Sequence, residues 1–274
     1  MRCKIFILFL GTVSLTGCVS TMDRYSPELY FDYMAAKEYA QRGDMEKAVE
    51  TMEFVLTEHL KKYPNDTEAL ILLGQAYYER KKYDESLAVF VRLCELKPKD
   101  GHALYQLGYL YMETGQKDQA VKTIQKSLKY SPNNPDALNT LGYLYIDASV
   151  NLAEATEMVQ KAIRLRPGNG AYYDSLGWAY YKQGREDLAL ANLQKADRLY
   201  KDPAISDHLG DVYRSMNNPE KAMEYWAKSL ELDPDQPAVI QKIEQNGGQW
   251  IKGSEIRDAG TKGAVSDLRA VILD

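Results

Sequence analysis

The fold of this chain is indicated by the stretch Leu104-Tyr105-Gln106-Leu107-Gly108-Tyr109-Leu110-Tyr111, because its central motif recurs along the sequence. The motif is Leu-Gly-x-x-Tyr, and its copies follow one another at intervals of 34, 34, 35 and 33 residues. The copies begin at Leu73, Leu107, Leu141, Leu176 and Leu209. A fixed period of roughly 20 to 50 residues is typical of a protein built from stacked repeats. The sequence therefore predicts an array with five clear repeats.

Each period contains the pattern of two helices. In the quoted repeat, one stripe lies at positions i, i+3, i+4 and i+7 of a first helix: Leu104, Leu107, Gly108 and Tyr111. A facing stripe follows on a second helix: Ala120, Ile124 and Ser127. Gly108 lowers helix propensity by about 1 kcal/mol, so we expect it to allow a close approach of the second helix. Gly115 predicts the turn between the helices, and Pro132 ends the second one.

This pattern resembles the tetratricopeptide repeat (TPR), in which a Leu-Gly-x-x-Tyr helix precedes an Ala-x-x-x-Phe helix and a terminal Pro. The resemblance implies an all-α fold, a right-handed superhelical solenoid of about six TPR helix-turn-helix repeats. We expect the array over residues 31–236, with five clear repeats from residue 67 and a degenerate first repeat before them. A capping helix is predicted over 237–247. Residues 248–274 form a Gly-rich tail, either a mobile arm or a segment folded back onto the array.

The first residues have the pattern of a lipoprotein signal. Arg2 and Lys4 precede the apolar stretch 5–10, and Leu15-Thr16-Gly17-Cys18 resembles the bacterial lipobox. The resemblance implies a signal peptide over 1–17, acyl chains on Cys18 and a lipidated tether over 18–30. Val19 stands where Asp would favour the inner membrane in related lipoproteins. We therefore expect a lipid-anchored protein of the cell envelope, on the outer membrane and facing the periplasm.

Charge and cysteine content exclude several classes of protein. The 274 residues carry a formal charge of -5, and without residues 1–17 the charge is -7. The longest basic run, Arg80-Lys81-Lys82, lies at a predicted helix–helix turn and is interpreted as a solvated loop, so we expect no nucleic-acid partner. Cys94 is the one cysteine that remains after signal removal and lipidation of Cys18, so no internal disulfide can form. Its apolar neighbours predict that Cys94 is a buried small hydrophobic residue.

Catalytic motifs are missing from the sequence. No Gly-x-Ser-x-Gly, His-Glu-x-x-His or Walker motif occurs. The three histidines lie in separate repeats, and Ser206-Asp207-His208 would point about 100° apart from one residue to the next on a helix. We therefore predict no enzyme activity, no cofactor, no metal site and no small-molecule substrate.

A second face of the first helices has a distinctive composition. The positions two before, two after and five after each motif leucine lie roughly 130° from the core stripe. In the TPR family, the matching face lines a concave groove that binds peptides. The predicted groove residues are Tyr78, Tyr105, Tyr109, Asn139, Tyr143, Asp174, Trp178, Tyr181, Asp207 and Asp211. The aromatic residues and Asn139 favour an extended protein segment, and the three Asp residues favour a basic or amino-terminal end. Alternatively, some of these aromatic residues only pack against the next repeat.

Two further stretches narrow the resemblance. Tyr172-Tyr173-Asp174-Ser175-Leu176-Gly177-Trp178 and Asp207-His208-Leu209-Gly210-Asp211-Val212-Tyr213, followed by Trp226, resemble outer-membrane TPR lipoproteins. Those lipoproteins are adaptors of periplasmic carboxyl-terminal-processing proteases and present peptidoglycan hydrolases to them. The resemblance implies a noncatalytic scaffold that brings a protease and cell-wall enzymes together. The alternative is a pilotin-like factor that assembles the secretin of a type IV pilus or secretion system.

Overall fold

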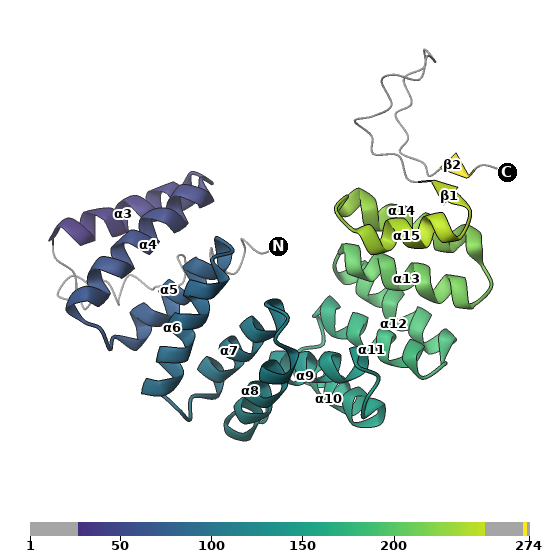
Figure 1. Cartoon of the computed structure of the whole chain (residues 1–274), viewed down its shortest axis with the longest axis horizontal. Coiled ribbons are helices and arrows are strands. Elements are labelled where there is room, and N and C mark those ends of the chain that lie inside the picture. Colours follow the sequence, from purple (N-terminus) through teal and green to yellow (C-terminus); the bar gives the residue numbers. More distant parts are fainter. Residues whose placement is uncertain (1–26, 250–270, 273–274) are drawn as a thin grey trace, which may run out of the picture. The chain divides into compact units, whose positions relative to one another are not determined.

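The computed structural model describes residues 27–249 and 271–272 (Figure 1). The chain divides into two compact units, and we call the described residues up to Pro132 unit 1 and those from Asn133 onward unit 2. The helices of unit 1 are α3 (Pro27–Gln41), α4 (Met45–Lys62), α5 (Thr67–Glu79), α6 (Tyr83–Leu96), α7 (Gly101–Glu113) and α8 (Lys117–Tyr130). Unit 2 contains α9 (Pro135–Asp147), α10 (Leu152–Leu165), α11 (Gly170–Lys182), α12 (Glu186–Leu199), α13 (Pro203–Ser215), α14 (Pro219–Leu232), α15 (Pro237–Gln245), β1 (Gly248–Gln249) and β2 (Val271–Ile272).

Within each unit the helices form hairpins, and each hairpin packs on its neighbours (Figure 1). The motif glycine is the point of closest approach between the two helices of a repeat. A Cβ atom at Gly108 would lie 2.5 Å from Ile124 Cγ1, and one at Gly210 would lie 2.4 Å from Trp226 Cδ1. Both distances are too short for a real contact, so only glycine fits. The all-α repeat fold and the packing role of Gly108 are confirmed.

Caps and turns explain where the helices begin and end. Asp100 Oδ1 accepts hydrogen bonds from the backbone N–H groups of His102 and Ala103 and caps α7. The turn between α7 and α8 requires a left-handed residue, which Gly115 supplies at φ 76°. Lys81 holds the corresponding turn of the preceding repeat at φ 58°. Side-chain caps and left-handed turn residues therefore mark the helix ends.

The ends of the array differ in part from the sequence expectation. α3 begins at Pro27, four residues before the predicted start of the array at residue 31, and a proline is favourable at the first position of a helix. α4 has 18 residues against 14 in α6, so the first repeat contains one additional helical turn. α15 lies inside the predicted capping segment. Gly248 pairs with Ile272 in an antiparallel β1–β2 ladder, so residues 271–272 return to the end of unit 2.

The cores of both units are built from the predicted stripes. In unit 1, Phe90 and Leu93 of α6 pack with Leu107 of α7. In unit 2, Leu193, Leu209 and Trp226 belong to one buried cluster that extends to Val239 and Ile243 of α15.

None of the described helices is both long and apolar enough to cross a membrane.

Candidate functional site

In unit 1, the predicted face is a cluster of half-buried tyrosines from α5, α6 and α7. The ring centroids of Tyr78 and Tyr109 are 6.1 Å apart, and Tyr105 lies 6.1 Å from Tyr109. Tyr83, which the sequence pattern did not include, lies 5.7 Å from Tyr78. Burial raises the pKa of Tyr109, and the nearby Glu113 carboxylate raises it further. The Tyr109 hydroxyl therefore stays protonated and able to donate a hydrogen bond.

In unit 2, the corresponding face contains a buried acid–base pair between neighbouring repeats. Asp174 of α11 is 9% exposed, and its Oδ1 lies 2.8 Å from Nδ1 of His208 on α13. Burial lowers the pKa of His208, but the carboxylates of Asp174, Asp207 and Asp211 raise it by more. His208 is therefore favoured as the cation and donates to Asp174. Asp174, which the sequence predicted as a groove residue, is thus covered and paired within its own chain.

Trp178 has partners from the same unit. Its ring stacks on His208 with a centroid distance of 4.1 Å and on Tyr181 with a distance of 4.8 Å. Lys182 Nζ lies 4.9 Å from the centroid of the same ring. These contacts fix the orientation of Trp178, so it forms a rigid part of the face.

Lys242 of α15 bridges the two remaining acids of the face. Its Nζ lies 2.6 Å from Asp207 Oδ1 and 2.8 Å from Asp211 Oδ2. Asp211 Oδ1 also accepts from Trp226 Nε1 at 3.1 Å. Burial lowers the pKa of Lys242, but its bonds to both carboxylates raise that pKa by more, so Lys242 is charged. The acidic end that the sequence assigned to a basic ligand is thus already paired within the chain by one cation. We call Asp174–His208 and Asp207/Asp211–Lys242 the inter-repeat clasps.

Asn139 of α9 lacks such a clasp. It occupies the position of Asp174 and Asp207 in its own repeat, and the side chain is partly exposed. Its Oδ1 atom is buried and accepts no hydrogen bond from any described residue. Tyr143, one turn further along α9, is half-buried. Burial raises the pKa of Tyr143, as do the carboxylates of Asp147 and Asp174, so its hydroxyl is a hydrogen-bond donor.

The ten predicted groove residues therefore form two separate sets. Unit 1 brings together Tyr78, Tyr105 and Tyr109, and unit 2 holds Asn139, Tyr143, Asp174, Trp178, Tyr181, Asp207 and Asp211. Sequence reasoning missed His208 and Lys242. The signal was present, because His208 follows Asp174 by 34 residues and Lys242 follows Asp207 by 35, about one repeat in each case. A one-repeat spacing places two residues on adjacent first helices.

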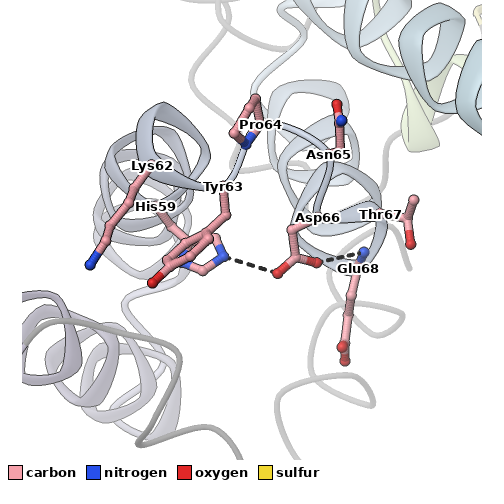
Figure 2. A pocket seen from close by; sticks show the side chains of 8 residues that line it. All are labelled: His59, Lys62, Tyr63, Pro64, Asn65, Asp66, Thr67 and Glu68. Atoms are coloured by element: carbon pink, nitrogen blue, oxygen red, sulfur yellow. Dashed lines mark hydrogen bonds and ion pairs between the residues drawn. The ribbon is translucent and has the colours of Figure 1, made fainter.

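A hollow of about 690 Å³ lies at the corner between α4 and α5 (Figure 2). Figure 2 shows Asp66 between the ring of His59 and the backbone of Glu68. His59 Nε2 lies 2.9 Å from Asp66 Oδ2, and Glu68 N donates to Asp66 Oδ1 at 3.1 Å. Burial raises the pKa of Asp66, but the bond to His59 and the backbone bonds lower it by more. These are the contacts of a helix cap, and we assign no ligand to this hollow.

The remaining sequence predictions concern Cys94, a metal site and Cys18. Cys94 is half-buried beside the core of unit 1, and burial raises the pKa of its thiol to about 11. It is less buried than predicted, because its side chain lies at the edge of the α6 core stripe. Residues 27–249 and 271–272 contain no group of three or more His, Cys, Asp or Glu that could hold a metal ion. Cys18 lies outside the described residues.

Comparison with known proteins identifies the repeats. Residues 74–115 match the TPR repeat family, and residues 101–134, 171–203 and 204–236 match tetratricopeptide repeats. The chain therefore contains tetratricopeptide repeats within residues 74–134 and 171–236. A search of curated proteins gave no significant match.

Solved structures support the same fold. A thermophilic TPR protein from Thermus thermophilus is 24% identical, with a TM-score of 0.55 over 66% of this chain and 98% of its own. The APC/C hetero-tetramer Cut9–Hcn1 gives a TM-score of 0.70 at 19% identity, over 86% of this chain and 45% of that chain. YrrB, described as a TPR protein with an unusual peptide-binding site, is 19% identical with a TM-score of 0.50, over 69% and 97%. Identities this low establish the fold alone.

Proposed function

We propose that this chain is a noncatalytic scaffold that holds an extended protein segment on the first-helix face of unit 2. The observation that carries the proposal is the buried Oδ1 of Asn139, which accepts no hydrogen bond from the described residues. A buried acceptor without a donor costs roughly 1–3 kcal/mol. Rotation of the partly exposed Asn139 side chain would present Oδ1 to a backbone N–H of a bound segment and remove that cost.

The surroundings of Asn139 support a segment of neutral or apolar character. Tyr143 offers a protonated hydroxyl one turn away on α9. Trp178 is held rigid by His208 and Tyr181 and offers its remaining ring edge as apolar surface. The carboxylates of Asp174, Asp207 and Asp211 are already paired within the chain. A basic partner end would have to compete with the inter-repeat clasps, so the favoured partner presents apolar side chains and backbone donors.

We further propose that the scaffold is anchored to the outer membrane through acyl chains on Cys18 and faces the periplasm. The lipobox-like Leu15-Thr16-Gly17-Cys18 and the preceding basic and apolar residues support this placement. More than one acyl chain is needed for a stable anchor. In the lipoproteins that this motif resembles, more than one acyl chain is attached to the cysteine. In this setting the bound segment belongs to a carboxyl-terminal-processing protease or to a cell-wall hydrolase that the protease degrades.

Affinity capture from detergent-solubilised envelopes tests the scaffold and its site together. The wild-type chain is compared with Asn139→Ala/Tyr143→Ala and with a control, Leu165→Ala, whose residue is 45% exposed on the second helix α10. Loss of a protease or hydrolase from the double variant alone would support the adaptor. Capture of a secretin would support the pilotin-like alternative. An identical partner list for all three chains would contradict a site at Asn139.

The anchor has an independent test. Cys18→Ser removes the thiol that receives the lipid, so we expect uncleaved or unlipidated protein. Equal retention of this variant and the wild type in membranes after a carbonate wash would contradict lipidation. The partner-binding experiment would be unaffected by that result.

A further inference from the structure

The second helix α8 carries a row of lysines on its solvent side. Lys122, Lys126 and Lys129 are spaced four and three residues apart, which places them within about 60° of one another around the helix. All three side chains are exposed, and the opposite side of α8 buries the core stripe. The structure gives no ion pair or hydrogen bond from any of the three ammonium groups to a described residue. The row extends about 10 Å along the helix.

The position of Lys126 is partnered in unit 2, whereas Arg164 and Arg198, which match Lys129, are exposed and form no ion pair with a described residue. Lys126 stands two residues after the large core residue of its second helix, as do Lys195 on α12 and Lys228 on α14. Lys195 Nζ lies 4.1 Å from the ring centroid of Tyr173. Lys228 Nζ lies 2.9 Å from Asp197 Oδ1. The repeat therefore provides partners for this cation in unit 2, whereas on α8 the positive charge faces solvent.

Local stability does not explain the row. Lys129 lies in the last turn of α8, where a cation is favourable next to the helix dipole. Lys122 and Lys126 gain nothing from that dipole, and like charges at i and i+4 disfavour a helix. Asp118, the acid of the first turn of α8, is exposed and has no ion pair to a described residue. The row therefore carries a small repulsive cost in a protein whose formal net charge is -5.

We propose that the lysine row of α8 is a docking surface for an acidic segment of a partner protein. Three cations in a single line match carboxylates spaced along one chain segment. Tyr130, which is 37% exposed at the end of α8, adds apolar contact area beside the row. A polybasic membrane-binding patch contains roughly 4–8 Lys or Arg residues, more than this row contains. The surface lies on a second helix of unit 1 and is separate from the proposed site at Asn139.

The test uses the full chain and a labelled alanine-rich helical peptide with glutamates at i, i+4 and i+7. We expect binding that weakens with salt and is lost when the glutamates are replaced by glutamines. Lys122→Gln/Lys126→Gln/Lys129→Gln should weaken binding by about tenfold. Glutamine has a helix propensity similar to that of lysine, so α8 should remain folded. The control variant Lys81→Gln/Arg164→Gln/Arg198→Gln removes the same charge from exposed sites elsewhere.

The outcomes separate the proposal from its alternatives. Equal weakening in both triple variants would mean that only net charge matters, which would overturn a specific surface. No binding of the acidic peptide to the wild type would also overturn it. The third arm uses phosphatidylcholine vesicles with and without phosphatidylglycerol. Binding to the anionic vesicles that depends on the row, without binding to the peptide, would make α8 a membrane contact instead.

Discussion

The same face of the first helices is built from different chemistry in the two units. Tyr105 in unit 1 and Asp174 in unit 2 hold matching positions, two residues before the motif leucine. Tyr105 contacts another tyrosine ring, whereas Asp174 is buried against His208 of the next repeat. The repeat motif therefore sets how the helices stack, and the adjoining face can be filled by either ring packing or ion pairing. Where ion pairs fill the face, less of it is left for a ligand.

The largest effect is expected from breaking the buried clasp. Asp174→Ala leaves the proton of His208 without its acceptor in a buried site, and we expect a loss of about 3 kcal/mol in unfolding free energy. Urea unfolding followed by tryptophan fluorescence measures this, because Trp178 and Trp226 both lie in unit 2.

The next largest effect is expected at the end of the array. Lys242→Met keeps the length of the side chain but leaves Asp207 and Asp211 without their shared cation. α15 is otherwise held mainly by two buried residues, Val239 and Ile243. We expect a local loss of about 1–2 kcal/mol, seen as faster amide hydrogen exchange in α15 than in α11. Unchanged exchange in α15 would show that apolar packing alone holds this helix.

The matched change in unit 1 should be smaller still. Tyr78→Phe keeps the ring and removes the hydroxyl, which lies 3.4 Å from Glu113 Oε2. We expect a loss of roughly 0.5–1 kcal/mol from this weak bond, measured by urea unfolding with circular dichroism. A comparable loss of unfolding free energy for Asp174→Ala and Tyr78→Phe would mean that side-chain contacts on this face stabilise the two units equally.

The smallest effect is a pH dependence specific to unit 2. The folded-state pKa of His208 is raised above its ordinary value of 6.5. The folded state therefore binds this proton more tightly than the unfolded state, so the stabilisation is complete below about pH 6.5. It is lost as the pH rises through the raised folded-state pKa. We expect the urea midpoint of the wild type to fall with rising pH in this window, relative to His208→Gln. Parallel curves for the two chains would contradict the assignment.

The sequence was sufficient for the repeats but not for the pairing between them. Leu107 and Gly108 could be read directly, because a helix period and a close helix approach are local properties. The same spacing predicted Asn139 and Trp178 on the face next to the core stripe. It could not show that Asp174 and Asp207 are satisfied, since that depends on which residues of the following repeat lie opposite them. The one-repeat spacing makes His208 and Lys242 candidates, and the contacts themselves come from the structure.

The inter-repeat clasps also limit how a gene for such a protein can lengthen. Repeat arrays grow by duplication, and each copy contacts only its nearest neighbours. A repeat inserted within unit 2 must keep every acid paired with a base of the next repeat. It therefore has to supply a base for the acid of the preceding repeat and an acid for the base of the following repeat. The repeat containing Asp207 and His208 meets this condition by itself. The repeat containing Asn139 does not, so its duplication would place a second uncompensated acceptor in the array.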